Sequence, residues 1–475
     1  MKKRAITAII AVLACAGATG AGAASGLSGT WVGTISFRSP AGVEPLPVSI
    51  ELRGRRAVVS LGRGHAARTT VVARVTGRRL RLSIPARPGR LAFDGRLKGR
   101  RIAGTVRNQA VRGRFSLRRG RALEEATLGL YRFADGRPLG VWSGEGPRIA
   151  SLYDEAEVRG LYRTQVGTYS LGAGLQTRSP SSGAATFAGN RATWRGTPAQ
   201  RVPVREKEVF VRSGGALLAC TLAIPPASGK RPAIAFAHGG GPAPRSYNSV
   251  NQLYFNHLGI ATLSCDKRGV GQSGGSYPGD LPTESVVDRY ARDVEAQARW
   301  LRTQPEIDAA RIGIAGASQA GWIMPVAASR EPAIRFMLGF VPPTLTQGET
   351  DLWAQLNDQG RSPPTRSDEE LEAEVRRAGP SGVDPMPAIR SMRIPAVWLF
   401  GGKDRTVPSR LCVERLDPVM REAGRDFSYR LFPGGTHGLV LTSNGLLDEQ
   451  ARSSHMVDGL YQAVRDWLQA RGLTG

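Results

Sequence analysis

The feature that most constrains the fold is an alternation of short apolar runs with amphipathic stretches in the second half of the 475-residue chain. The runs have the length of buried strands, and the stretches between them have helical spacing. The runs cover residues 233–237, 260–264, 312–315, 335–341, 396–400 and 427–432, and the helical stretches lie near 246–258, 284–303, 319–330, 409–423 and 450–471. This alternation predicts an α/β fold with a mostly parallel sheet and helices on both faces.

A serine lies at the turn between one predicted strand and the next predicted helix. The hexapeptide Gly316-Ala-Ser-Gln-Ala-Gly321 follows the apolar run at 311–315 and leads into the helical stretch at 319–330. Small residues on both sides suit a tight turn that holds its serine in a strained conformation and exposes the hydroxyl. Ligands of such sheets bind at the carboxyl ends of the strands. Ser318 is therefore the candidate nucleophile.

His437 is selected by elimination, because the chain has only five histidines. It alone lies in a loop beyond Ser318, in the chain order serine, aspartate, histidine. The other four lie in a basic β-rich segment, at the start of a glycine-rich loop or in predicted helices: His65, His238, His257 and His455.

Asp404 follows the apolar run at 396–400, where a strand end would direct its carboxylate toward His437. Asp384 and Asp426 remain as alternatives. A serine hydroxyl is a poor nucleophile at neutral pH, so the histidine would accept its proton and return it to the leaving group. The aspartate would orient the imidazole and stabilise its cationic form.

Five motifs occur in a fixed order between residues 205 and 475. They are His238-Gly-Gly-Gly241, Asp266-Lys-Arg-Gly-Val-Gly-Gln-Ser273, the hexapeptide around Ser318, Gly402-Lys-Asp404 and Gly435-Thr-His-Gly438. Together they resemble the α/β-hydrolase fold superfamily, in its branch of secreted esterases and prolyl-oligopeptidase-like serine hydrolases. The sequence departs from the usual Gly-x-Ser-x-Gly elbow, because Ala320 replaces the second glycine. We interpret the motif beginning at Asp266 as a structural turn.

This resemblance implies a hydrolase that cleaves carboxylic esters or thioesters through an acyl-enzyme, without a cofactor or a metal ion. It also implies an oxyanion hole formed by the backbone N–H of Gln319 and that of Gly239 or Gly240. Two alternatives remain open. One is an aminopeptidase or prolyl-oligopeptidase-like peptidase, so the substrate is a small-molecule ester or a peptide. The other is a protein whose basic N-terminal region binds a polyanion or a small ligand, with the hydrolase domain secondary.

An insertion of roughly 50 residues, 342–395, separates two predicted strands of the hydrolase domain. Ser367 is followed three residues later by Glu370, which is typical of a capping box at a helix start. The superfamily commonly carries a cap over the active site at this point, so the resemblance implies a cap here. A peripheral excursion is the alternative.

The N-terminus has the three parts of a secretory signal. Lys2-Lys-Arg4 precedes the apolar residues 5–14, and Ala21-Gly-Ala23 supplies small residues for cleavage, so residues 1–24 are predicted to be a signal peptide. The mature protein is expected to be periplasmic, secreted or at the cell surface. A lipid anchor at Cys15 is the alternative. No other stretch approaches 18 apolar residues, so no transmembrane helix is expected in the mature protein.

Most of the net charge of +26 belongs to residues 25–125, which contain 22 arginines and lysines against 5 acidic residues. About eight short alternating stretches separated by glycine predict a small antiparallel barrel or sandwich there. We interpret the arginines as the solvated face of strands. Binding of an anionic cell-envelope polymer by this segment remains open, and nucleic acid is disfavoured.

Residues 126–205 are turn-rich and predict an accessory β-rich region that leads into the hydrolase domain at 206–475. Cleavage after the signal would leave Cys220, Cys265 and Cys412. Cys220 and Cys265 lie in predicted strands, and the sparse, odd set is no disulfide framework. Cys220 and Cys265 are therefore interpreted as buried thiols, with a bridge between them as the alternative, and the spacing of the cysteines predicts no metal site.

Overall fold

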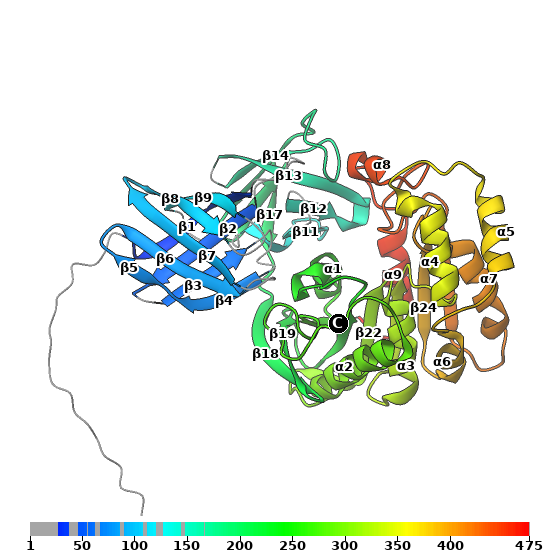
Figure 1. Ribbon diagram of the computed structural model, residues 1–475. Helices are drawn as coiled ribbons and strands as arrows, with labels where there is room; N and C mark the ends of the chain where they lie inside the picture. Colours follow the sequence, from blue (N-terminus) through cyan, green and yellow to red (C-terminus); the bar gives the residue numbers. More distant parts are fainter. Residues whose placement is uncertain are drawn as a thin grey trace, which may run out of the picture.

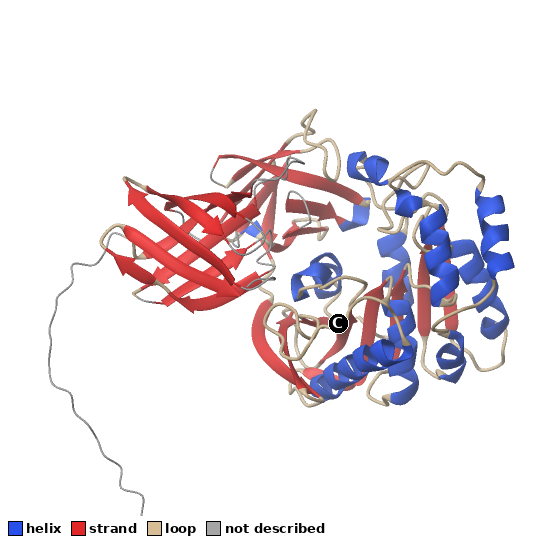
Figure 2. Ribbon diagram, in the orientation of Figure 1, coloured by secondary structure: helices blue, strands red, loops and turns tan. Residues whose placement is uncertain are grey.

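The computed structural model describes residues 27–37, 46–54, 56–61, 67–85, 90–107, 112–119, 127–143, 148–165 and 167–474. The predicted signal peptide, Cys15 and His65 lie outside these residues. Among the helices of the described ranges, none has both the length and the apolar character needed to cross a bilayer. Figure 2 shows two units built of strands and a third in which most helices lie.

Nine antiparallel strands form the first unit, in the order β4-β3-β2-β1-β9-β8-β7-β6-β5. They are β1 (Gly29–Phe37), β2 (Leu46–Arg53), β3 (Arg56–Leu61), β4 (Ala67–Val72), β5 (Arg74–Thr76), β6 (Arg79–Pro85), β7 (Arg90–Lys98), β8 (Arg101–Arg107) and β9 (Arg112–Arg119). The sheet curls until β4 contacts β6. Alternate residues point inward and form one hydrophobic core, in which Trp31 is buried and donates from its indole to the Leu27 carbonyl at 2.7 Å.

The next eight strands form a closed barrel with its own core. They are β10 (Gly129–Phe133), β11 (Pro138–Ser143), β12 (Arg148–Leu152), β13 (Glu157–Gln165), β14 (Thr168–Leu171), β15 (Ala184–Ala188), β16 (Arg191–Trp194) and β17 (Thr197–Arg201), with η3 (Tyr153–Glu155) between β12 and β13. All of its pairings are antiparallel, and β10 closes the barrel against β17. The turn-rich region 126–205 is thus a complete barrel.

The third sheet has the order β18-β19-β21-β20-β22-β23-β24-β25. Its strands are β18 (Arg205–Ser213), β19 (Ala216–Ile224), β20 (Arg231–Ala237), β21 (Ala261–Cys265), β22 (Ile307–Ala317), β23 (Phe336–Phe340), β24 (Ala396–Gly401) and β25 (Phe427–Phe432). The strands from β21 to β25 pair in parallel, whereas β18 and β19 are antiparallel. The carboxyl ends of β22, β24 and β25 therefore lie at one edge of the sheet. Figure 1 labels β22 and β24 within this sheet.

Helices connect these strands. They are α1 (Ser249–His257), α2 (Glu284–Arg302), α3 (Ala320–Arg330), α4 (Gln347–Leu356), α5 (Asp368–Ala378), α6 (Met386–Ser391), α7 (Ser409–Met420), α8 (Leu447–Arg452) and α9 (Leu460–Gln469), with η4 (Arg245–Asn248) and η5 (Asp358–Gly360). Alternate residues of β20 enter two hydrophobic clusters. Ala235 packs in a cluster with α2 and α3, and Phe236 packs in another with α1 and α9.

The closed barrel shares one of these clusters with the third sheet. Leu130 and Tyr153 of the barrel are buried in the cluster that contains α1 and α9. The Tyr153 hydroxyl donates to the Val250 carbonyl at 3.0 Å, and its ring lies against Tyr254 and Tyr461. Burial of this apolar surface fixes the barrel against the α/β unit.

The helical stretch predicted at 450–471 is wrong, because α8 and α9 are separate helices. Residues 453–456 between them are extended and pair with the barrel: His455 forms a bridge with Glu157, and the Val158 amide donates to the Ser454 carbonyl at 2.8 Å. Gly459, with φ of +75°, then starts α9. His455 therefore lies in a loop, and not in a helix as its sequence context predicts.

The insertion 342–395 contains α4, η5, α5 and α6. The predicted capping box is present, because the Ser367 side chain accepts from the Glu370 amide and the Glu370 carboxylate accepts from the Ser367 amide. The insertion contacts the loop after β24: the Trp353 indole donates to the Asp404 carbonyl at 3.1 Å, and Arg405 donates to the Asn357 side chain at 3.1 Å.

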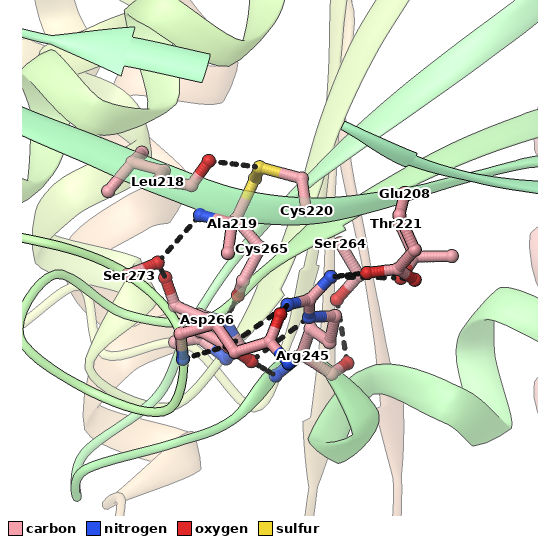
Figure 3. Close-up of polar contacts among 12 residues, drawn as sticks. Glu208, Leu218, Ala219, Cys220, Thr221, Arg245, Ser264, Cys265, Asp266 and Ser273 are labelled. Atoms are coloured by element: carbon pink, nitrogen blue, oxygen red, sulfur yellow. Dashed lines mark hydrogen bonds and ion pairs between the residues drawn. A yellow bond between two sulfur atoms is a disulfide. The ribbon is translucent and has the colours of Figure 1, made fainter. Parts of the chain in front are cut away.

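The prediction that Cys220 and Cys265 are free thiols is wrong, because they form a disulfide (Figure 3). The two residues are direct partners in the antiparallel pair of β19 and β21, which brings their side chains together. Cys412 is a free, buried thiol.

Candidate active site

Ser318 lies in the turn between β22 and α3 in a left-handed backbone conformation, with φ of +56°. A non-glycine residue in this region is strained and is held there by its surroundings. The Ser318 amide donates to the Phe340 carbonyl at 3.1 Å, and its carbonyl accepts from the Gly321 amide at 2.7 Å. The turn thus has the backbone geometry expected for an exposed nucleophile.

Close packing around the turn accounts for Ala320 at the usual glycine position. A methyl group added at Gly316 would lie 2.6 Å from the Ala320 Cβ, so the alanine fits because residue 316 has no side chain. The position after the serine that has no room for a side chain is Gly321, one residue later than in the usual elbow. A methyl group at Gly321 would lie 2.7 Å from Pro343 and 2.8 Å from Pro342.

His437 and Asp404 lie together after β25 and β24. The His437 Nδ1 donates to Asp404 Oδ2 at 2.8 Å. The other carboxylate oxygen accepts from the amides of Thr406 at 2.7 Å and Val407 at 2.9 Å. Asp404 is buried and its backbone hydrogen bonds fix the carboxylate, so the imidazole is held with Nε2 available to accept a proton.

Burial of His437 on its own would lower its pKa. The charge of Asp404 and the hydrogen bond to it outweigh this effect, so the pKa of His437 is raised from its ordinary value. The two loops are also joined by their backbones, because the Lys403 amide donates to the Gly435 carbonyl at 2.7 Å.

The two alternative carboxylates make other contacts. Asp384 pairs with Arg415 at 2.7 Å, and Asp426 pairs with Arg471. Among the contacts described for these residues, neither carboxylate reaches His437.

Ser318 and His437 follow different strands at the same sheet edge. In the part of the chain that the structure describes, the Ser318 hydroxyl forms no hydrogen bond with His437. Such bonds are often long without substrate and shorten when substrate binds.

Two of the predicted oxyanion donors lie beside the turn. Gln319 is buried immediately before α3, and a methyl group added at Gly239 would lie 3.5 Å from the Ser318 Cβ. Within the described residues, the amides of Gln319, Gly239 and Gly240 have no acceptor, whereas the Gly241 amide donates to Asp280 at 2.5 Å. A methyl group at Gly240 would meet no atom within 4 Å. Gly239 is therefore better placed than Gly240.

Lys267, which its sequence motif predicts to lie in a structural turn, contacts the residues of both donors. Its buried ammonium donates to the carbonyls of Gly239 at 2.6 Å and Gly241 at 3.0 Å, and to the Gln319 side chain at 3.1 Å. An ammonium has three donors, and all three are used. Lys267 thus ties the glycine-rich loop to the residue after Ser318.

Burial lowers the pKa of Lys267 to about 8. The Tyr290 ring lies 4.7 Å from the ammonium and offers a cation–π contact. One sequence signal could have indicated this residue, since the chain has only seven lysines among its 65 basic residues.

His238 is buried, and burial lowers its pKa to about 4, so it is neutral at pH 7. Its Nε2 donates to the Cys265 carbonyl at 2.5 Å, which leaves Nδ1 to accept from Asn248 at 3.4 Å. Both nitrogens are occupied in fixing the glycine-rich loop against β21. His238 therefore has a structural position, and not that of a general base.

Asp266 organises the turn after β21, next to the disulfide (Figure 3). Its carboxylate accepts from the Arg245 amide at 2.8 Å and the Gln272 amide at 2.9 Å, and pairs with the Arg245 guanidinium. Its carbonyl accepts from Ser273 at 2.7 Å. This network agrees with the interpretation of the motif as a structural turn.

In the described ranges, no group of three or more His, Cys, Asp or Glu side chains is arranged to hold a metal ion.

No protein-family model matches the chain, and no curated protein matches it. Among solved structures, the chain is similar to an esterase of Pyrococcus furiosus, with 17% identity over 56% of this chain and 91% of that one and a TM-score of 0.41. It is similar to acetyl xylan esterase 1 of Thermoanaerobacterium, with 18% identity over 50% of this chain and 83% of that one and a TM-score of 0.34. A dienelactone hydrolase of Anabaena variabilis has 17% identity over 56% of this chain and 98% of its own, with a TM-score of 0.34.

Proposed function

We propose that the protein is an exported serine hydrolase of the α/β-hydrolase superfamily that cleaves carboxylic esters, with thioesters as a close variant. Ser318 is the nucleophile, His437 the general base and acid, and Asp404 the residue that orients the imidazole. One observation carries the proposal. The buried Asp404 holds His437 Nδ1 at 2.8 Å, at the sheet edge where Ser318 is held in a left-handed turn.

In the first half of the reaction, the Ser318 oxygen attacks the acyl carbon while its proton passes to His437 Nε2. The tetrahedral oxyanion is stabilised by the amides of Gln319 and Gly239, and removal of one such donor typically lowers kcat by about 10² to 10³. The bond to the leaving alcohol or thiol then breaks as His437 returns the proton to it. This leaves an acyl ester on Ser318.

In the second half, a water molecule attacks the acyl carbon and gives its proton to His437. The bond between the acyl carbon and the Ser318 oxygen breaks, and His437 returns the proton to that oxygen. A carboxylic acid leaves. Asp404 keeps the imidazole in the correct tautomer and its charge stabilises the imidazolium formed at both stages; replacing such an aspartate by asparagine typically lowers kcat by about 10⁴.

Labelling with a fluorophosphonate tests the nucleophile. We expect the probe to label the wild type and not the Ser318→Ala variant. Ser329→Ala is the matched control, because Ser329 lies in α3 and donates to the Val326 carbonyl, away from the turn. Labelling that persists in Ser318→Ala, or is lost equally in Ser329→Ala, contradicts the assignment.

A panel of nitrophenyl esters and thioesters, compared with aminoacyl and prolyl amides, tests the substrate class. We expect short esters to have the higher kcat/KM. Faster turnover of the amides would favour the peptidase alternative while retaining the same three residues.

Export is supported by the disulfide of Cys220 and Cys265, since such bonds persist in oxidising compartments. We expect cell fractionation to recover the protein outside the cytoplasm, with a mature N-terminus near Ala24. A lipid-modified N-terminal Cys15 in mass spectrometry would instead identify an anchored protein. Recovery of the intact chain in the cytoplasm would contradict export.

A further inference from the structure

The outer face of β5 to β9 is rich in cationic side chains. Alternate residues of these strands fill the core, and the others point outward. The cationic residues on the outward side are Arg74, Arg79, Arg81, Arg90, Arg96, Lys98, Arg101, Arg107, Arg112, Arg114 and Arg118. Among the described outward residues of these strands, Asp94 is the one carboxylate, and it pairs with Arg79 and Arg81. Together these residues are referred to below as the arginine face.

The register places like charges directly opposite one another. The cationic pairs are Arg74 with Arg81, Arg79 with Arg96, Lys98 with Arg101, Arg101 with Arg118, and Arg107 with Arg112. Only the pair of Arg81 with Asp94 joins opposite charges. Like charges directly opposite destabilise a sheet. Solubility alone does not require cations to face each other across the register. A bound polyanion would neutralise these facing charges and remove their repulsion.

We propose that the arginine face binds a linear polymer of phosphate groups. Guanidinium groups match phosphate oxygens bidentately, and ten of the eleven cations are arginines. Strands lie about 4.8 Å apart, so the cations that face each other across the register are close enough for one flexible polyanion to contact several of them. Figure 1 shows this sheet at the opposite end of the molecule from the helices α4 to α7.

The composition of the arginine face disfavours two other anionic partners, single-stranded nucleic acid and a lipid bilayer. Aromatic side chains that stack on bases are the usual platform for single-stranded nucleic acid. In the described part of β5 to β9, the aromatic residues Phe93 and Phe115 are buried in the core and meet edge to face. The large exposed hydrophobic side chains described for the chain also lie outside these five strands, so this face offers nothing to insert into a bilayer.

The variant Arg101→Glu separates binding from stability. Arg101 lies between Lys98 and Arg118 in the register, so a glutamate there creates two opposite-charge pairs and should raise the melting temperature. The same variant should weaken binding of the polymer. Arg335→Glu is the matched control, because Arg335 is exposed before β23 and the change in charge is identical.

Binding of fluorescent inorganic polyphosphate to the full-length mature protein is measured at several salt concentrations. We expect log K to fall linearly with log salt, Arg101→Glu to bind about tenfold more weakly with a slope reduced by about 1, and Arg335→Glu to bind as the wild type does. The four-residue variant of Arg101, Arg107, Arg112 and Arg118 to Gln should abolish binding at physiological salt.

Four outcomes overturn the proposal. They are absence of polyphosphate binding, equal weakening by Arg101→Glu and Arg335→Glu, tighter binding of single-stranded DNA, and tighter binding of phosphatidylglycerol vesicles. Esterase activity is not used as a readout, so failure here leaves the proposed function intact.

Discussion

Lys267 donates a hydrogen bond to the Gly239 carbonyl at 2.6 Å, and so holds the glycine-rich loop from below. Because the same ammonium also reaches the Gln319 side chain, one buried charge positions both proposed oxyanion donors. This arrangement makes Lys267 a positioning residue in the proposed reaction.

Replacing Lys267 by methionine should lower kcat about 10²-fold with little change in KM, since the loss of one oxyanion donor has an effect of that size. Lys230→Met is the control, because Lys230 is exposed. Steady-state kinetics of both variants test this. A proportionate rise in KM with unchanged kcat would contradict a role in positioning the donors.

The pH dependence of the same variant gives a second test. The pKa of Lys267 is lowered to about 8, so its neutral amine, with two donors, replaces the ammonium above that pH. We expect the kcat of the wild type to fall above pH 8, and the methionine variant to lack this fall at alkaline pH.

The free energy of unfolding of the wild type should change in the opposite direction to kcat as the pH rises above 8. In the unfolded chain Lys267 keeps its proton up to about pH 10.4, whereas in the folded protein it loses the proton above about pH 8. Between these two pH values the folded protein no longer buries a charged ammonium, so the wild type gains stability relative to the methionine variant.

The acid side of the pH profile of kcat/KM, its acid limb, should report the protonation of His437. The pKa of His437 is raised by Asp404, so kcat/KM should fall as pH drops through a value above 6.5, where the imidazole can no longer accept a proton. Asp404→Asn should reduce kcat by about 10⁴ and move this limb to lower pH. Asp426→Asn, at the alternative carboxylate, should leave the pH profile unchanged. An equal effect of both variants would refute the choice of Asp404.

The effect of His437 on stability follows from the same shift. A histidine whose pKa is raised in the folded state contributes stability below its unfolded pKa and loses that contribution as pH rises through the folded pKa. The Asp404→Asn variant should therefore lose more stability at pH 6 than at pH 8. Chemical denaturation at the two pH values measures the difference.

Sequence order was sufficient to predict that Asp404 and His437 lie close together, because the chain has few histidines and parallel strands bring their carboxyl ends to one edge of the sheet. It was not sufficient for Lys267, whose acceptors lie 26 to 52 residues away in the chain. A lysine in a turn looks solvent-exposed until the fold encloses it. The residues of the proposed triad are recognisable by local motif, whereas Lys267 is placed by contacts between distant segments.

The disulfide was missed for a similar reason. Cys220 and Cys265 lie in strands, as their sequence context predicts, but β19 pairs with β21 and not with β20, the next strand in sequence. Only the strand order makes the two cysteines neighbours. The break at 453–459 was missed because pairing of residues 453–456 with the closed barrel, which lies some 300 residues earlier, overrides the local helical pattern.

Loss of the disulfide should destabilise the protein. It closes a loop of 45 residues, which corresponds to about 4 kcal/mol in the chain-entropy model. We expect the double variant Cys220→Ala and Cys265→Ala to melt at a lower temperature. Reduction should lower the melting temperature of the wild type and have no effect on the double variant. An equal response of both proteins to the reductant would indicate that the bond does not form.

The closed barrel should influence His437 through the segment 451–457. The barrel amides of Leu175 and Gln176 donate to the carbonyls of Ser453 at 2.7 Å and Ala451 at 2.8 Å, and the Met456 amide donates to the barrel at Ala156. The Val457 amide then donates to the Leu439 carbonyl at 2.9 Å, two residues beyond His437. The barrel thus supports the histidine loop by continuous backbone contacts.

Gly174→Ala tests this connection, because an added methyl group would lie 2.1 Å from the Arg452 carbonyl oxygen and displace the segment. Gly215→Ala is the matched control, since a methyl group there meets no atom within 4 Å. We expect Gly174→Ala to lower kcat about tenfold, as small displacements of catalytic groups do, and to move the acid limb to lower pH as the contact between His437 and Asp404 loosens. Loss of melting temperature alone, with kcat and the acid limb as in Gly215→Ala, would show that the barrel stabilises the protein without positioning His437.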